Sequence, residues 1–263
     1  MRMNLSLVSN RNTKIFLLIF LTVIAIVGIA FVPRIPQQQS FHHFADQRNL
    51  YAIPGCLNVV SNAGFMLVGL AGIISALANH VNARLRLMYL VLFTGILLTA
   101  CGSGYYHWAP DNNRLVYDRL PMVIVFMAFL AIVIAEWINL TAGYRLLPLL
   151  LTAGILSVIW WQHTENAGNG DLRFYMLVQF YPMILIPLIL LLFYKQSRNV
   201  GLLQMGYIIA WYIVAKILER YDDLLFHKIK LISGHSLKHI AAAVATWYMV
   251  TFFRIRHIKS PGN

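Results

Sequence analysis

The chain has 263 residues, of which 59% are hydrophobic and only 11% are charged. Because a soluble domain carries about 25% charged residues, this chain has too few polar side chains to cover a globular surface, and we expect lipid to be part of its solvent. Its formal net charge is +12, but the basic residues lie between apolar runs rather than on one polar face. This pattern favours membrane orientation and contact with anionic lipid headgroups over nucleic-acid binding.

Apolar runs follow one another along the chain. The first spans residues 15–32 and precedes Pro33-Arg34-Ile35-Pro36, which offers no small-residue cleavage site, so we expect an uncleaved transmembrane helix. The later runs each approach the roughly 20 residues that a spanning helix needs, and they lie at about 57–78, 86–106, 115–137, 145–162, 174–194, 202–218 and 236–253. Since only helices satisfy their own backbone in lipid, we predict an all-α polytopic membrane protein with eight transmembrane helices in total.

The charges of the loops predict how these helices are oriented. With the amino terminus in the cytoplasm, the short inner segments are almost purely basic, and Glu136 is the only acid near them. The outer segments then hold every other acid. Because short cytoplasmic loops are enriched in lysine and arginine, we expect both termini to be cytoplasmic.

Polar residues that are costly in a membrane gather at one predicted depth, the outer end of the bundle. His107 closes the third predicted helix, Asp118 opens the fourth, and His235 and His239 open the eighth. Ser103 lies four residues before His107, so both side chains face the same side of their helix. His235 and His239 have the same spacing, which can present two imidazoles to one metal ion.

With His107, the histidine pair would give a metal ion three nitrogen ligands. Three protein ligands and an open position are typical of catalytic zinc, whereas structural sites are closed by four ligands. Such an ion lowers the pKa of its water to about 7 and polarises a carbonyl. Asp118 could accept a proton from that water or orient it, and Ser103 could hydrogen-bond a developing oxyanion. Either cluster alone is better explained by helix capping, headgroup contact or backbone hydrogen bonding, but the combination at one level favours a site.

Two acids lie just upstream of the histidine pair. Glu219 and Asp222 end the seventh predicted helix at the same level. One of them could accept a hydrogen bond from a ligand imidazole, as carboxylates around metal sites often do. Simple placement at the membrane interface explains them equally well.

Three motifs occur together: Gly102-Ser103-x-x-x-His107, Asp118-Arg119-Leu120-Pro121-Met122 and His235-x-x-x-His239. This combination resembles the alkaline ceramidase family, part of a wider group of seven-helix, zinc-dependent membrane hydrolases that includes the adiponectin receptors. The segments Asp46-Gln47-Arg48-Asn49 and Asn58-Val59-Val60-Ser61-Asn62 look like the family's amino-terminal signature, so the resemblance runs from about Phe44 to Phe253. It implies hydrolysis of the amide of ceramide to a sphingoid base and a fatty acid. It also implies zinc at the three histidines, with the serine and the aspartate beside it.

The chain departs from the family in two respects. It has an extra helix before the family's seven, and it lacks most of the acids that form a calcium site in eukaryotic ceramidases. Asp46 and Asn49 remain, but Gln47-Arg48 and Pro54-Gly55 stand where further ligands are expected. Arg48 would repel calcium, so a salt bridge from Arg48 to a nearby acid is favoured over Ca²⁺.

The resemblance implies three parts of the chain. Residues 1–35 would be a cytoplasmic amino terminus with the extra helix, residues 36–255 a seven-helix catalytic domain, and residues 256–263 a cytoplasmic basic tail. The expected partners are a lipid amide substrate and membrane lipids, with no nucleic acid. We expect a bacterial inner membrane, with the active site near its outer face.

Two other interpretations remain open. A non-enzymatic membrane receptor or metal-binding protein on the same scaffold would use the histidines without hydrolysis. A transporter or a retinal protein would use Lys216 in the seventh predicted helix, as a Schiff-base lysine in the retinal case. A lone helical lysine is weak support for this, and we expect no acid at mid-membrane to serve as its counter-ion.

Overall fold

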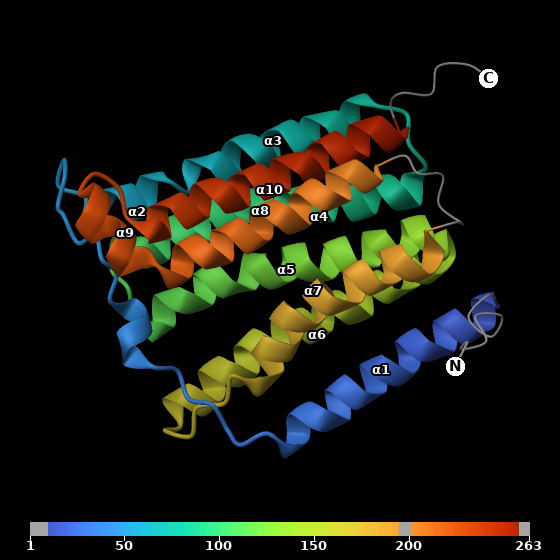
Figure 1. Ribbon diagram of the computed structural model, residues 1–263, viewed down its shortest axis with the longest axis horizontal. Coiled ribbons are helices and arrows are strands. Elements are labelled where there is room, and N and C mark those ends of the chain that lie inside the picture. The colour runs from blue at the N-terminus through green and yellow to red at the C-terminus, as the bar shows by residue number, and fades with distance from the viewer. Residues whose placement is uncertain (1–9, 195–200, 258–263) are drawn as a thin grey trace, which may run out of the picture.

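The computed structural model describes residues 10–194 and 201–257. Residues 1–9, 195–200 and 258–263 lie outside the described residues, and with them Arg2, Lys195, Arg198 and Lys259 of the predicted inner segments and most of the predicted basic tail. Within the described part, every regular element is a helix, and the long helices run side by side in one bundle (Figure 1).

The long helices coincide with the predicted apolar runs. They are α1 (Arg11–Phe31), α3 (Ala63–Ala78), α4 (Ala83–Trp108), α5 (Asn112–Trp137), α6 (Leu140–Asn166), α7 (Arg173–Phe193), α8 (Leu202–Arg220) and α10 (Gly234–His257). Two short elements were not predicted, η2 (Gln39–His42) and α9 (Asp222–Ile229). The start of the run predicted at about 57–78 forms a separate short helix, α2 (Cys56–Val60). The chain passes from α2 into α3 through Ser61 and Asn62.

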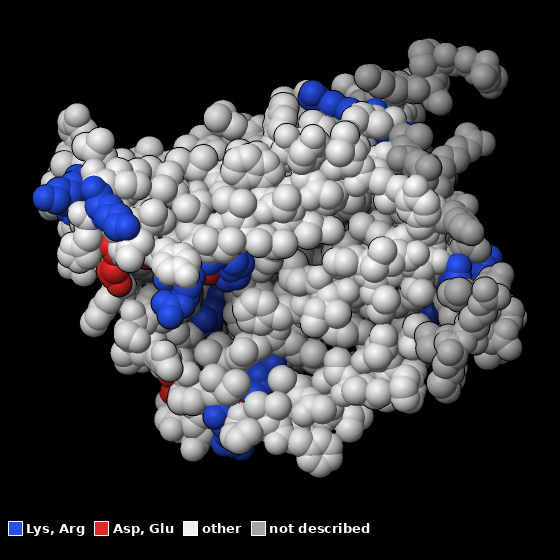
Figure 2. All heavy atoms as spheres, in the orientation of Figure 1, with Lys and Arg blue, Asp and Glu red and all other residues white. Residues whose placement is uncertain are grey.

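Seven segments of the described chain are long and apolar enough to cross a membrane, namely α1, α2 with α3, α4, α5, α6, α7 and α8. They indicate a multi-pass membrane protein. On the face shown in Figure 2, uncharged atoms cover most of the bundle, and lysine and arginine side chains gather near its ends and around one hollow. The eighth predicted span, α10, is not among the seven, because polar residues such as Lys238 and His239 interrupt its apolar sequence.

The extra amino-terminal helix lies at the edge of the bundle, whereas α5 lies at its centre. α5 packs against α4, α6 and α7, and most of its apolar window is buried. α1 packs against α7 and leaves large side chains such as Phe16, Phe20 and Ile24 exposed. Exposed apolar surface of this extent is favourable when its solvent is lipid.

The carboxyl-terminal helix, α10, runs from one end of the bundle to the other. α10 begins beside α2 and α9 and packs along α3 and α8. Near its last turn, Arg256 Nε and His257 Nε2 each lie 2.7 Å from the buried Glu136 carboxylate of α5. α1 begins and α10 ends at this same end of the bundle (Figure 1), so the start of α10 lies at the opposite end.

Candidate metal centre and adjoining cavity

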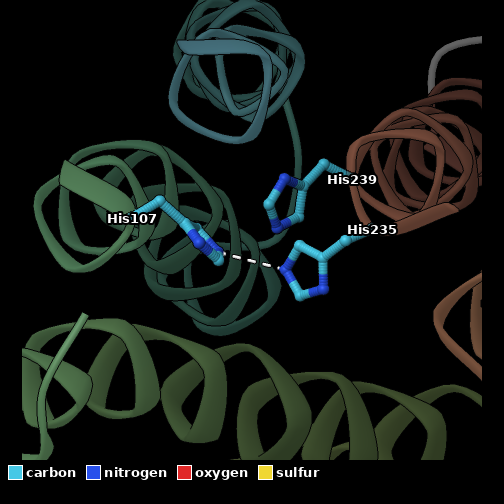
Figure 3. Close-up of side chains that lie close together, drawn as sticks. All are labelled: His107, His235 and His239. Atoms are coloured by element: carbon cyan, nitrogen blue, oxygen red, sulfur yellow. Dashed lines mark hydrogen bonds between the residues drawn. The ribbon is translucent and has the colours of Figure 1, made fainter. Parts of the chain in front are cut away.

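Three buried histidines from two helices converge at the end of the bundle where α10 begins (Figure 3). His107 lies in the last turn of α4, and His235 and His239 lie one turn apart at the start of α10. They are 3%, 6% and 3% exposed, respectively. One nitrogen from each ring lies within 4.8 Å of the other two. The predicted spacing therefore brings the three rings together, and they could bind a metal ion.

The arrangement of the ring nitrogens fits a metal ion. His107 Nε2 and His235 Nε2 are 3.2 Å apart, and two nitrogens held about 2 Å from one tetrahedral ion lie about 3.3 Å apart. His107 Nδ1 and His239 Nε2 are buried without a hydrogen-bond partner. Leaving such atoms unpaired costs about 1–3 kcal/mol each, and ligation would satisfy one of them. Three imidazoles suit zinc and also other divalent ions, so the geometry leaves the metal's identity open.

One of the three histidine rings, that of His239, is oriented by a serine that the sequence analysis did not single out. Ser61 Oγ lies 2.8 Å from His239 Nδ1 and donates to the carbonyl of Asn58 at 3.2 Å. Because that hydroxyl proton is used, Ser61 accepts the proton of Nδ1, which leaves a free lone pair on His239 Nε2. The polar segment at the α2–α3 junction, in an otherwise apolar run, was the signal that could have identified Ser61.

In the described part of the chain, the carboxylates of the two acids upstream of α10 bond to groups other than an imidazole. Asp222 accepts hydrogen bonds from the backbone amides of His235 at 2.7 Å and Ala45 at 3.0 Å. A carboxylate in this position stabilises the first turn of α10 and so positions His235. Glu219 instead forms ion pairs with Lys216 and Lys238.

These two lysines connect Glu219 on α8 to the three histidines. Lys216 pairs with Glu219 one turn away in the last turns of α8, an ion pair that the sequence analysis did not predict. Lys238 Nζ lies 3.5 Å from Glu219 Oε1 and 3.1 Å from His235 Nε2. Lys238 therefore lies between this carboxylate and the His235 nitrogen that could bind a metal ion, a position that the sequence analysis did not predict.

A cavity of about 570 Å³ adjoins the histidines, and Ser103, Asp118 and His239 lie in its wall. Most of the remaining wall is apolar and comes from α5, α7, α8 and α10. Ser103 is buried, and its hydroxyl interacts with the Asp118 carboxylate. The structure therefore brings the predicted serine and aspartate together beside the predicted ligands.

Ser103 and Asp118 meet because α4 and α5 approach closely at a glycine. A Cβ atom added to Gly102 would lie 1.9 Å from the carbonyl oxygen of Tyr117. Only glycine permits this separation, since real Cβ atoms stay at least 3.0 Å from such neighbours. The residues that follow Gly102 and Tyr117 in the chain are the serine and the aspartate.

The segment between α1 and α2 covers the metal centre. Phe44 lies with its ring centroid 4.6 Å from that of His107 and 4.3 Å from that of His235. The segment is anchored to the α6–α7 loop, because Gln37 N donates to Glu165 Oε2 and Leu172 N donates to the carbonyl of Ile35. This cover limits the access of water to the histidines.

The predicted salt bridge of Arg48 is present, and it occupies the position considered for calcium. Arg48 Nε and Nη2 donate to the two carboxylate oxygens of Asp46 at 2.8 and 2.7 Å. Arg48 also donates to the carbonyls of Lys230 and Leu231. Burial raises the pKa of Asp46, but the hydrogen bonds and charge of Arg48 outweigh it and hold the pKa below its usual value. With Asp46 paired and Asn49 exposed, the arrangement does not favour a calcium site.

No protein-family model matches the chain, and no curated protein matches its sequence.

Proposed function

We propose that the protein is a membrane-embedded, zinc-dependent amidase of the alkaline ceramidase type, which hydrolyses ceramide-like lipids to a sphingoid base and a fatty acid. One observation carries this proposal: the buried histidines adjoin, through His239, a largely apolar cavity that Ser103 and Asp118 also line. A metal centre beside such a cavity suits a substrate with a long hydrocarbon chain and a reactive polar group.

The residues around the cavity have complementary tasks in this reaction. Zinc held by the three histidines would supply an activated water and polarise the substrate carbonyl. The apolar wall binds the acyl chain and so holds the amide beside the histidines, which raises its effective concentration. The single hydroxyl proton of Ser103 turns from Asp118 to the substrate carbonyl oxygen as that oxygen gains negative charge.

Asp118 is the residue that transfers the proton in this scheme. Its carboxylate orients the attacking water or takes a proton from it. Hydrolysis adds the water oxygen to the carbonyl carbon and breaks the C–N bond, and the leaving amine nitrogen receives a proton. The Phe44 segment keeps bulk water out during these steps, since it lies over two of the ligand rings.

The proposal includes a membrane arrangement. α10 would be an eighth span, because it runs along α3 and α8 through the bundle. The bundle end that carries the histidines would face the outside, and the end that carries Glu136 would face the cytoplasm, where short basic segments are favoured. The residues before α1 and those after α10 would then all be cytoplasmic.

Release of sphingoid base from ceramide by the purified protein tests the proposal. Wild type should be active, lose activity with a chelator and regain it with zinc. His107→Ala should be inactive, whereas His80→Ala, in the loop between α3 and α4 at the other end of the bundle, should match wild type. Thermal melting of both variants separates loss of chemistry from loss of fold. Metal-loaded, folded protein that hydrolyses no lipid amide would refute the amidase and favour a non-enzymatic receptor.

A further inference from the structure

Arg119 occupies an unusual place for a cation. It lies on α5 directly after Asp118, is only 5% exposed, and lines the same cavity as Ser103 and His239. A buried charge costs several kcal/mol unless it is paired and hydrogen-bonded. The partners of Arg119 therefore bear on what the cavity binds.

Aromatic rings hold the guanidinium group in a fixed orientation. Its central carbon lies 4.1 Å from the ring centroid of Trp161 on α6 and 4.4 Å from that of Tyr175 on α7. Nη2 donates to Gln37 Oε1 at 2.7 Å. Stacking of this kind stabilises a cation, but these partners leave its charge unneutralised.

The other terminal nitrogen of Arg119 is unused. Nη1 is buried and has no hydrogen-bond partner, and none of the ion pairs among the described residues involves Arg119. Asp118, its neighbour in sequence, forms none of these ion pairs and interacts with Ser103. An oriented, buried guanidinium with a spare donor is the arrangement that recognises carboxylates and phosphates.

The charges around the cavity also favour an anion. Among the described residues, its wall contains three cations, Arg119, Lys216 and Lys238, but only two carboxylates, Asp118 and Glu219. Glu219 is already bonded to both lysines. Positive charge therefore exceeds negative charge in the wall even before a metal ion binds.

We propose that Arg119 forms an anion subsite of the cavity, and that the substrates are N-acyl lipids with a carboxylate or phosphate group close to the scissile amide. The group must lie within reach of the amide because Arg119 lines the same cavity as Ser103, Asp118 and His239. The substrate class rests on the proposed amidase function, whereas the anion subsite can be tested without any hydrolysis.

Binding of three probes with the same hydrocarbon chain tests the subsite. Oleate, oleyl phosphate and neutral oleyl alcohol each displace a fluorescent fatty alcohol from the purified, metal-loaded full chain. We expect carboxylate, phosphate or both to bind about 30-fold more tightly than the alcohol, as a charge-assisted hydrogen bond provides. Arg119→Gln should abolish this preference. Arg114→Gln, a change at the more exposed start of the same helix, should keep it.

The controls make each outcome decisive. Equal binding of the three probes to wild type would overturn the subsite. A carboxylate preference that survives Arg119→Gln would also overturn it, because the anion would then lie at the histidine-bound metal. Arg119→Lys keeps the charge but not the planar stack, so it should retain part of the preference even if Arg119→Gln fails to fold, and thermal melting reports the fold of each variant.

Hydrolysis of matched substrates tests the substrate class. N-oleoylglycine is compared with its neutral amide N-oleoylglycinamide, and phosphorylated ceramide with ceramide. A kcat/KM about 30-fold higher for the anionic member of either pair, lost in Arg119→Gln, supports the class and identifies the anion. Equal rates within both pairs would refute the class and leave the amidase intact. Hydrolysis of none would refute the amidase, while the binding result still decides the subsite.

Discussion

Replacement of Gly102 by alanine tests whether the close approach of α4 and α5 builds the site. The new Cβ would lie 1.9 Å from the Tyr117 carbonyl oxygen and 2.8 Å from its carbonyl carbon. Since the obstacle is backbone, the two helices must separate locally by roughly 1 Å, and overpacking of this kind costs about 1–3 kcal/mol. The melting temperature should fall by roughly 5 °C. The same shift would move Ser103 away from Asp118, and a displacement of about 1 Å can lower catalysis about 100-fold.

Gly104, two residues further along α4, offers a matched control. No atom lies within 4 Å of a Cβ placed there, so Gly104→Ala should be neutral or stabilise the helix by about 0.5–1 kcal/mol. Thermal melting and lipid-amide hydrolysis are measured for both variants in one detergent. Equal melting temperatures and equal rates for Gly102→Ala and Gly104→Ala would refute the close-approach argument.

Two further substitutions probe the surroundings of the metal centre. Ser61→Ala removes the hydrogen bond to His239 Nδ1. It should weaken metal affinity by about 10-fold or more, because residues that hydrogen-bond metal-binding histidines typically contribute this much. Unchanged affinity in a metal-competition titration would contradict this role of Ser61. Asp46→Asn removes a carboxylate whose pKa Arg48 holds below its usual value. The ion pair of Asp46 with Arg48 therefore stabilises the folded protein fully above about pH 4, and this stabilisation is lost as the pH falls through the lower pKa of the folded state. The difference in melting temperature between wild type and Asp46→Asn should therefore shrink below about pH 4, and a difference that grows on acidification would contradict the assignment.

The helices and the histidine cluster could be predicted because their signals are local. Uninterrupted apolar runs of spanning length leave only helices in lipid, and α4 to α8 lie where those runs lie. The four-residue spacing of His235 and His239 fixes their common face. An even number of membrane passes lies between the end of α4 and the start of α10, so His107 lies at the same end of the bundle as His235 and His239.

The contacts around the cluster could not be predicted, because they join segments far apart in the sequence. Phe44 covers the histidines, and Arg48 reaches the carbonyls that precede α10, but neither contact follows from the residues beside them. Glu219 could have accepted a hydrogen bond from an imidazole, yet it pairs with Lys238 of α10 as well as with Lys216 of its own helix. Charged partners on separate helices become visible only when the helices are packed.

Metal analysis of the purified full chain tests the central claim most directly. Wild type should contain about one zinc ion per chain, as an open three-histidine site holds. His239→Ala should lose the metal, while Ser103→Ala, which alters the cavity but no ligand, should retain it. Wild-type protein that remains metal-free after exposure to zinc, with its fold intact, would contradict the account.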